Sequence, residues 1–379
     1  MKIALISFHS FYQPGGVKRH ILGLAKEFKK RGIETKIIAP RRKRGENYGK
    51  DVILLGTSFP FPFSGGISDL GINFNPLSIE KTLRKEKFDV LHFHNFGFPS
   101  TLQILASPST SKTLNILTFH ANIKGSKFLK RFPFLLYLVK KIADWRIDGI
   151  IGVAPLNLEP FKKYKKPKIV IPNGIDLDVF NPKVPKIKKF SDGKINILFL
   201  GRIEERKGLI YLLKAYKILE KKFRNLRLIV VGEGPQKKEM EEFVKENGLK
   251  EVVFEGEVKE DKVANYYTTC DLFCSPATHG ESFGLVLVEA MACQKPVVAF
   301  ANEGYFQFLH NKKGGILVKN KDWRELAKKL AILIKNQKLR EKMGKIALKE
   351  AEEYSWTKIA DRVLDFYQFC QREKLKSKV

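Results

Sequence analysis

Several features of secreted, membrane-spanning and metal-binding proteins are scarce or missing in this sequence. The longest central apolar stretch, Phe132–Val139, is far too short to cross a bilayer, and the N-terminal segment does not have the pattern of a signal peptide. Among 379 residues there are four cysteines, which form no CxxC pair and are not joined by histidines at zinc-site spacing: Cys270, Cys274, Cys293 and Cys370. We therefore expect a cytoplasmic protein with reduced, buried thiols.

Acidic residues are also few relative to basic ones. The 70 lysines and arginines against 40 aspartates and glutamates give a formal net charge of +30. Such a charge favours anionic partners, which include nucleic acid, acidic lipid and phosphorylated small molecules. The sequence contains no helix-turn-helix, zinc-finger or aromatic RNA-binding motif. Non-enzymatic nucleic-acid binding is therefore the least favoured of the three alternatives.

What the sequence has is a regular alternation of short apolar runs with amphipathic segments. This alternation is typical of βαβ units, and it predicts two doubly wound α/β halves with parallel sheets. Proline and lysine accumulate between the two halves, where the periodicity stops. We expect a first domain over residues 1–175, a linker over 176–194, a second domain over 195–355, and a closing helix over 356–379 that packs back on the first domain.

Two segments of the first half depart from this alternation. Gly56–Pro76 is rich in Phe, Pro, Gly and Ser and has no period, which predicts a loop packed over the core, with a hydrophobic acceptor or lipid contact as the alternative. Lys124–Arg146 interleaves basic with large apolar side chains. This pattern fits a helix at a membrane interface, and equally a core-facing helix with a solvated basic face.

The most informative stretch runs from Gly280 to Ala292 and reads GESFGLVLVEAMA. It follows an apolar strand and opens an apolar helix near Gly284. The backbone N–H groups of Phe283, Gly284 and Leu285 are therefore expected to point out of the helix start into a cleft. Such donors, together with the helix dipole, suit a diphosphate.

The same stretch carries two carboxylates. Glu281 lies just before the expected helix and Glu289 lies about one and a half turns into it. On either side of a bound diphosphate, they would accept hydrogen bonds from the hydroxyls of a sugar and of a ribose. The alternative is structural: Glu281 caps the helix and Glu289 is a buried acid with a partner.

Two cations are expected at the same edge of the second sheet. Arg202 ends the first strand of the second half, and Lys207 begins the next helix. Because strand ends and helix starts of a doubly wound sheet meet at one edge, these side chains would neutralise a leaving diphosphate there. The alternative is a solvated charge run over Glu204–Lys207.

Taken in order along the chain, these motifs resemble those of glycosyltransferase family 4, from about Lys2 to Trp356. The matching pieces are Gly15-Gly16-Val17, Thr118-Phe119-His120, Asn173-Gly174-Ile175-Asp176, Gly201-Arg202, Lys207-Gly208, Val231–Pro235, Phe254–Val258 and the pair Glu281 and Glu289. The resemblance implies the GT-B architecture, in which two Rossmann-like domains face each other across a cleft. The first would hold the acceptor and the second a nucleotide sugar.

The family also implies roles for the nucleotide-binding residues. Arg202 and Lys207 would bind the diphosphate of the donor, and Gly16 would let the backbone approach its phosphate. Glu289 would bind the ribose.

The remaining roles concern the sugar and the base. Glu281 would hold hydroxyls on the far side of the donor sugar, and His120 would lie near the reacting centre. The segment that contains Gly256 and Val258 would face the base. The family is retaining, and the sequence leaves open whether retention arises by front-face return or through a covalent intermediate.

Two local features differ from other glycosyltransferases. Many relatives carry a glutamate where this chain has Gln307, so their specificity does not transfer to it directly. Asp176-Leu177-Asp178 spells the DxD string that binds metal in the other large glycosyltransferase fold, but here it belongs to the hinge motif. We therefore expect no metal and no cofactor beyond the nucleotide-sugar substrate.

Within the family, the GESFGLVLVEAMA stretch most resembles the phosphatidylinositol mannosyltransferases. That resemblance implies transfer of mannose from GDP-mannose to a lipid-linked or inositol-phosphate acceptor, by a cytoplasmic protein that is peripheral on the inner face of the membrane. A nucleotide sugar and an anionic membrane surface are then the expected partners, and nucleic acid is not. The main alternative is a soluble enzyme that uses a UDP- or ADP-sugar, and a sugar-nucleotide epimerase of similar fold is less favoured.

Overall fold

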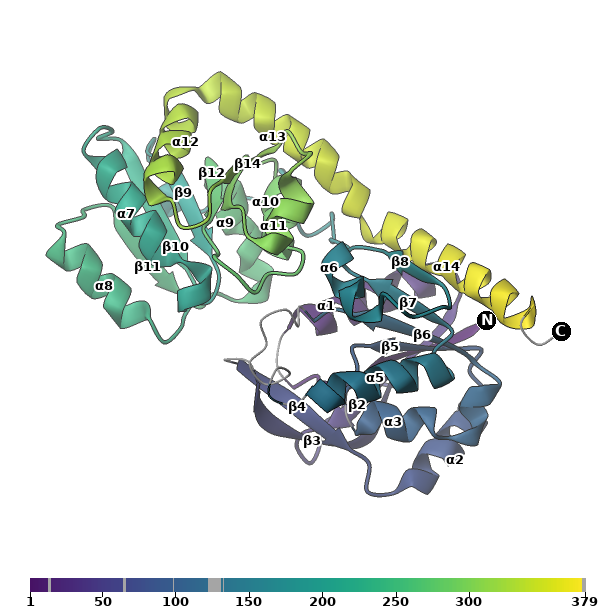
Figure 1. The fold of residues 1–379 in the computed structure, drawn as a ribbon. Coiled ribbons are helices and arrows are strands. Elements are labelled where there is room, and N and C mark those ends of the chain that lie inside the picture. Colours follow the sequence, from purple (N-terminus) through teal and green to yellow (C-terminus); the bar gives the residue numbers. More distant parts are fainter. Residues whose placement is uncertain (13–14, 64–65, 98, 122–130, 132, 377–379) are drawn as a thin grey trace. The chain divides into compact units, whose positions relative to one another are not determined.

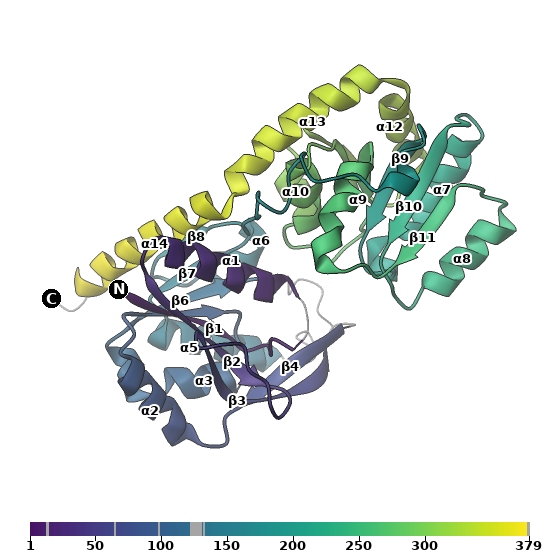
Figure 2. The ribbon, with the colours of Figure 1, turned by 180° about the vertical axis from the view of Figure 1, so that it is seen from behind.

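The computed structural model describes residues 1–12, 15–63, 66–97, 99–121, 131 and 133–376. The chain forms two compact units, which Figures 1 and 2 show from opposite sides. Unit 1 comprises Met1–Gly174 and Trp356–Val379, and unit 2 comprises Ile175–Ser355. None of the helices within the described ranges combines the length and the apolar character that a membrane span requires.

Unit 1 is built on an eight-stranded sheet in the order β4-β3-β2-β1-β5-β6-β7-β8. All neighbouring strands are parallel except β3 and β4, which pair antiparallel. The strands are β1 (Lys2–Ser7), β2 (Glu34–Arg41), β3 (Val52–Phe63), β4 (Gly66–Ile72), β5 (Val90–His94), β6 (Leu114–Phe119), β7 (Gly149–Gly152) and β8 (Lys168–Val170). The apolar runs of the sequence predict seven strands here, and β4 is the one that they do not predict. The predicted strands are Lys2–Phe8, Thr35–Ala39, Asp51–Leu55, Asp89–His94, Asn115–His120, Gly149–Val153 and Lys168–Ile171.

Alternate residues of the central strand β1 enter two separate hydrophobic clusters, because successive side chains of a strand point to opposite faces. Ile3 and Leu5 pack with α1 (Gly16–Lys30) and α14 (Trp356–Lys376) on one face. Ala4 and Ile6 pack on the other face, against helices α2 (Pro76–Glu86), α3 (Ser100–Leu105) and α5 (Pro133–Arg146). A further short helix, α6 (Pro155–Leu158), follows β7. Burial on both faces explains the continuous apolar runs of the sequence.

The prediction of a packed loop over Gly56–Pro76 is wrong, because most of this segment forms the β3–β4 hairpin. Two prolines obscured the strand, Pro60 and Pro62. Because they are two residues apart, both lack the N–H group on the same edge of β3. Beyond Thr57, β3 has β4 as its partner and no longer pairs with β2, so one side of β3 needs no N–H donors there.

Unit 2 contains a six-stranded, fully parallel sheet in the order β11-β10-β9-β12-β13-β14. Its strands are β9 (Ile195–Leu200), β10 (Leu226–Val231), β11 (Val252–Gly256), β12 (Leu272–Ser275), β13 (Val297–Phe300) and β14 (Gly315–Val318). One face is covered by α9 (Val263–Thr269), α10 (Leu285–Ala292) and α11 (Glu303–Leu309). The other is covered by α7 (Leu209–Glu220), α8 (Lys237–Glu246) and α12 (Trp323–Lys335), and α13 (Gln337–Ala351) packs beside both layers.

The segment 176–194, which the sequence marks as a linker, lies within unit 2. Phe180 and Phe190 of this segment are buried in the hydrophobic cluster on the α10 side of the sheet. The closing helix α14 lies in unit 1, where the ring of Trp356 fills the space beside Gly23 and Gly174. A Cβ atom at either glycine would lie within 2.4 Å of that ring, so both positions require glycine.

Candidate active site

The start of helix α10 is built around a glycine with left-handed backbone. Gly284 has φ 90°, and a Cβ atom there would lie 2.7 Å from the ring of Tyr305. Leu287 donates a backbone hydrogen bond to the Gly284 carbonyl, so the N–H groups of Phe283, Gly284 and Leu285 precede the intrahelical ladder. The Phe283 side chain is buried against Phe308, so the part of this residue that can serve a ligand is its backbone.

Glu281 and Lys207 meet at the carboxyl edge of the second sheet, as expected. The Lys207 Nζ atom lies 2.7 Å from Oε1 of Glu281, and the two side chains are 15% and 12% exposed. Arg206 Nη1 lies 3.0 Å from the same oxygen. Glu281 therefore faces two cations, which is more than helix capping requires. The sequence did not single out Arg206, which figures there only as part of the charge run Glu204–Lys207.

Gly208 fixes the backbone beneath this pair. It has φ 69°, and a Cβ atom would lie 2.2 Å from the carbonyl oxygen of Pro276. The loop after β9 and the loop after β12 are therefore in direct contact. Gly304 brings α11 into contact with the same region, since a Cβ atom there would lie 2.3 Å from the Glu281 carbonyl oxygen. Three loops thus converge on Glu281.

Arg202 is more open than Lys207. Its side chain is 57% exposed, and its Nε atom lies 3.5 Å from Oε2 of Glu204. Glu204 is also paired with Arg206, so it links the two arginines of this loop. Arg202 does not contact Glu281 in these interactions, and its role in binding phosphate stays a prediction.

Glu289 lies inside unit 2, with 3% of its surface exposed. Tyr267 on α9 donates a hydrogen bond of 2.8 Å to its Oε2 atom. This contact fits the structural alternative, in which Glu289 is a buried acid with a partner. The ribose role of Glu289 stays a prediction. Tyr267 is a second residue that the sequence reasoning did not identify, because nothing in the helical pattern of α9 distinguishes it from its neighbour Tyr266.

The segment expected to face the base follows the edge strand β11. Gly256 ends that strand with φ 71°, and its carbonyl accepts a hydrogen bond of 2.7 Å from the N–H of Gly232. A Cβ atom at Gly256 would lie 2.9 Å from Oε1 of Glu233. Val258 is half-buried against the core. The ends of β10 and β11 are therefore held together at the sheet edge.

The two predicted site residues of unit 1 lie on different elements. Gly16 is the exposed first residue of α1. His120 directly follows β6, and its backbone N–H donates to Oδ1 of Asn95 at 2.6 Å. The His120 ring lies near two further histidines, His20 and His94, with ring centroids 4.7 and 5.6 Å away. These two were missed, although an HxH pattern at a strand end is a signal that points to His94.

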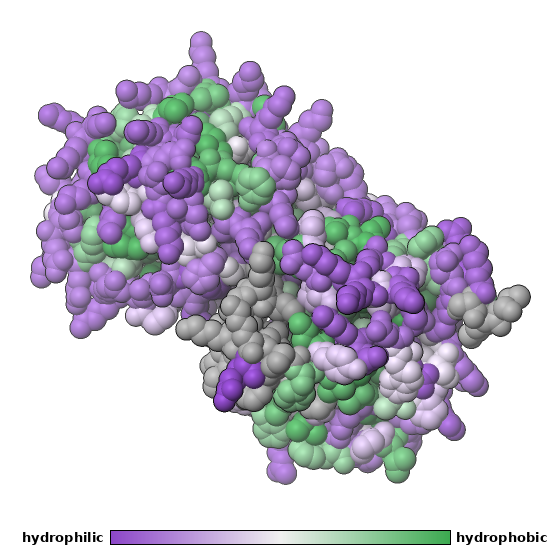
Figure 3. All heavy atoms as spheres, viewed as in Figure 1, coloured by the Kyte–Doolittle hydropathy of each residue, from purple (hydrophilic) through white to green (hydrophobic). Residues whose placement is uncertain are grey.

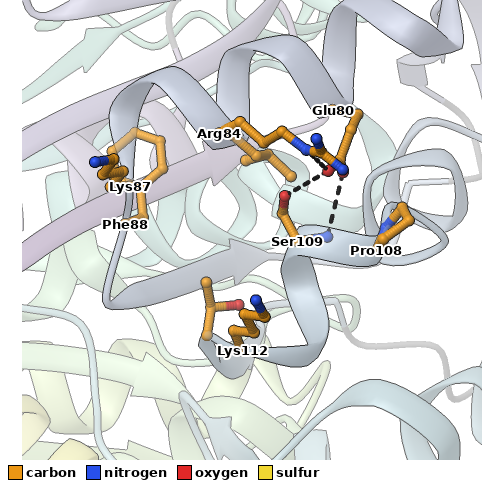
Figure 4. A pocket seen from close by; sticks show the side chains of 9 residues that line it. Glu80, Arg84, Lys87, Phe88, Pro108, Ser109 and Lys112 are labelled. Atoms are coloured by element: carbon orange, nitrogen blue, oxygen red, sulfur yellow. Dashed lines mark hydrogen bonds and ion pairs between the residues drawn. The ribbon is translucent and has the colours of Figure 1, made fainter.

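A pocket of about 560 Å³ lies elsewhere in unit 1, and none of the predicted site residues lines it (Figure 4). Its wall includes Glu80 and Arg84 on α2 together with Ser109. Hydrogen bonds from Ser107, Arg84 and Ser109 lower the pKa of the Glu80 carboxyl to about 2. These contacts join α2 to the loop before β6, and they explain the pocket as a structural junction.

Comparison with known proteins identifies the family. A model described as Glycosyltransferase Family 4 matches residues 14–179, and one described as Glycosyl transferases group 1 matches residues 180–350. A phosphatidyl-myo-inositol mannosyltransferase of Mycobacterium leprae is 30% identical over 380 residues, which cover 97% of this chain and 96% of the relative. The chain belongs to glycosyltransferase family 4. It is a glycosyltransferase, as the ordered motifs predict.

Solved structures of other glycosyltransferases share its fold. Anabaena HepE in complex with UDP has a TM-score of 0.77 at 18% identity, covering 97% of this chain and 100% of that one. Sucrose-phosphate synthase from Thermosynechococcus elongatus has a TM-score of 0.75 at 20% identity, covering 98% and 99%. The family 4 enzyme therefore has the predicted GT-B fold, with two Rossmann-like units.

Proposed function

We propose that this enzyme transfers mannose from GDP-mannose to a lipid-linked or inositol-phosphate acceptor, with retention of anomeric configuration, at the cytosolic face of a membrane. The observation that carries the proposal is the near full-length similarity to a phosphatidyl-myo-inositol mannosyltransferase. The similarity includes the half of the chain that holds Glu281 and Lys207 and the half that holds His120.

The donor half of the proposal depends on unit 2. When the glycosidic bond breaks, negative charge develops on the leaving diphosphate, and Lys207 and Arg202 would stabilise it together with the N–H groups that precede the intrahelical hydrogen bonds of α10. The close approach of Lys207 to Glu281 supports this, because it places a cation that can bind phosphate beside a carboxylate that can accept hydrogen bonds from sugar hydroxyls. Glu289 would bind the ribose, and the Gly256–Val258 segment would face the base.

The acceptor half depends on unit 1. His120 is neutral at pH 7, since burial lowers the pKa of its ring well below the usual value. A neutral ring near the reacting sugar can donate or accept one hydrogen bond without adding charge. Gly16 at the start of α1 would allow close approach of a phosphate.

The membrane half is supported by the surface of α5. Phe134, Tyr137 and Trp145 are exposed on this helix, and Lys141 and Arg146 lie over the rings of the last two. Figure 3 shows hydrophobic patches among hydrophilic side chains on the visible face of unit 1. Exposed aromatic and basic side chains on one helix suit a membrane interface. Residues 122–130 and 132 of the basic segment lie outside the described residues.

The proposal is tested by calorimetric titration of GDP-mannose, GDP-glucose, UDP-glucose and ADP-glucose, followed by product analysis with phosphatidylinositol, inositol phosphate and water as acceptors. We expect GDP-mannose to bind most tightly and the product to be an α-mannoside of the inositol headgroup. Tight binding restricted to UDP- or ADP-sugars would overturn the donor assignment. Transfer to neither inositol acceptor would overturn the acceptor assignment.

A further inference from the structure

Three histidine rings meet at the carboxyl edge of the parallel sheet of unit 1. His94 is the last residue of β5, His120 follows the neighbouring strand β6, and His20 lies on α1, which follows β1. Strands β1 and β5 are adjacent, and from them the strand order runs outward in both directions. The rings therefore gather at the point of a doubly wound sheet where ligands bind.

The rings are close enough to share one small ligand. One nitrogen atom from each of the three rings can be chosen so that all three lie within 4.8 Å of one another. Nδ1 of His94 and Nε2 of His120 are 3.3 Å apart. A tetrahedral zinc site with Zn–N bonds of about 2.0–2.1 Å places its ligand nitrogens about 3.3–3.4 Å apart. One pair thus already has the required spacing, and the nitrogen of the third ring lies within 4.8 Å of both.

The hydrogen bond that His20 makes fixes which of its ring nitrogens can bind a cation. Nδ1 of His20 lies 2.8 Å from the side-chain oxygen of Asn173, to which it donates its proton. This leaves a lone pair on Nε2 of His20.

That lone pair has no partner among the described residues. Nε2 of His20 is buried without a hydrogen bond. His20 as a whole is 3% exposed. A buried nitrogen atom without a partner is costly, and a bound cation would satisfy the lone pair directed at it.

We propose that His20, His94 and His120 bind one late first-row divalent cation, of which Zn²⁺ is the best match to three imidazole ligands. Asn173 acts behind His20, where it fixes the ring and its tautomer, as outer partners of metal-bound histidines do. The His92 ring lies beside that of His94, tilted by 34°, but takes no part, because its two nitrogens are bound to Thr118 and Tyr367.

A bound cation would hold the His120 ring away from the sugar. The site would therefore be inhibitory, and this consequence depends on the proposed function of His120. Metal binding itself does not depend on it, because it requires the ring positions alone. Free zinc would then slow an enzyme that needs no metal for turnover.

The site is tested on the metal-free full-length enzyme by titration with Co²⁺, whose tetrahedral complexes absorb visible light. We expect a band that saturates at one Co²⁺ per chain and is displaced by Zn²⁺. His20→Gln and His94→Gln should each weaken Co²⁺ binding more than 100-fold, and Asn173→Ala should weaken it about 10- to 100-fold. His310→Gln is the matched control, because His310 is an exposed histidine of unit 2.

Absence of the band in wild-type enzyme, or its retention in both histidine variants, would overturn the site. Circular dichroism and thermal melting without metal check that the variants are folded; if they are not, the wild-type titration still decides. Sugar transfer with and without Zn²⁺ tests the consequence separately. A saturable band without inhibition would refute the inhibitory role and count against a role of His120 in transfer, while inhibition without the band would refute the metal site.

Discussion

Replacement of Lys207 by alanine is the most direct test of the donor site. The Lys207 ammonium lies 2.7 Å from Glu281, and both side chains are largely buried, so the charge acts where solvent screens it weakly. Loss of one charge-assisted contact to a leaving diphosphate should cost about 2–4 kcal/mol of transition-state stabilisation. This corresponds to a fall in kcat/KM of about 30- to 1,000-fold.

The fold should change little in this variant. Arg206 still lies 3.0 Å from Glu281, so the carboxylate keeps a cation, and the free energy of unfolding should fall by about 1 kcal/mol. The measurements are steady-state kinetics with the nucleotide sugar, calorimetry with free nucleotide, and thermal melting. Lys238→Ala removes the same charge from a site that is 89% exposed on α8 and serves as the control. Near-normal kcat/KM in Lys207→Ala, or an equal loss in the control, would refute the assignment.

Four further outcomes are expected. Glu281→Gln should lower kcat while leaving affinity for free nucleotide unchanged, whereas Glu289→Gln should lower both, as titration of free nucleotide against the two variants will show. Turnover should persist in excess EDTA, and its complete, reversible loss would contradict the expected absence of a metal requirement. The Glu80 carboxyl has a lowered pKa, so it stabilises the fold at pH values above its usual pKa of 4.5, and this contribution disappears as the pH falls towards about 2. The difference in urea midpoint between wild type and Glu80→Gln should therefore shrink from pH 7 to pH 3. Anionic vesicles should co-sediment the enzyme at low salt but not at 1 M salt, where the Debye length is about 3 Å. The double substitution Lys140→Ser and Lys141→Ser should weaken vesicle binding more than the same change at two exposed lysines of α13.

Much of the fold is encoded in short-range patterns that sequence reasoning detects. The central strands of both sheets are buried on two faces, so they appear as continuous apolar runs between polar segments. The β3–β4 hairpin was not predicted because its sequence mixes prolines and aromatics. Whether β3 tolerates Pro60 and Pro62 also depends on which strands pair beside it. That information belongs to the sheet and is absent from the local sequence.

In the donor site, too, the local sequence predicts some contacts, while others depend on tertiary packing. The strand ends and helix starts on which Lys207 and Glu281 lie predicted that the two residues share an edge, and the structure places them in contact. They did not predict that Arg206 reaches the same oxygen, because tertiary packing decides which side chains of the short helical turn Glu205–Lys207 face Glu281. Nor did they predict Tyr267 as the partner of Glu289, because that pairing depends on how α9 packs against α10.

The histidine cluster lies furthest beyond what the sequence alone can show. Its members are separated by 74 and 26 positions and lie on one helix and two strand ends. A lone histidine at a strand end is more often a satisfied core residue than a ligand, and each taken alone has that interpretation. The sheet order brings His94 and His120 side by side, and the packing of α1 then adds His20 with an unpartnered nitrogen. It is this combination, rather than any single residue, that makes the cluster a candidate cation site and makes the Co²⁺ titration a decisive measurement.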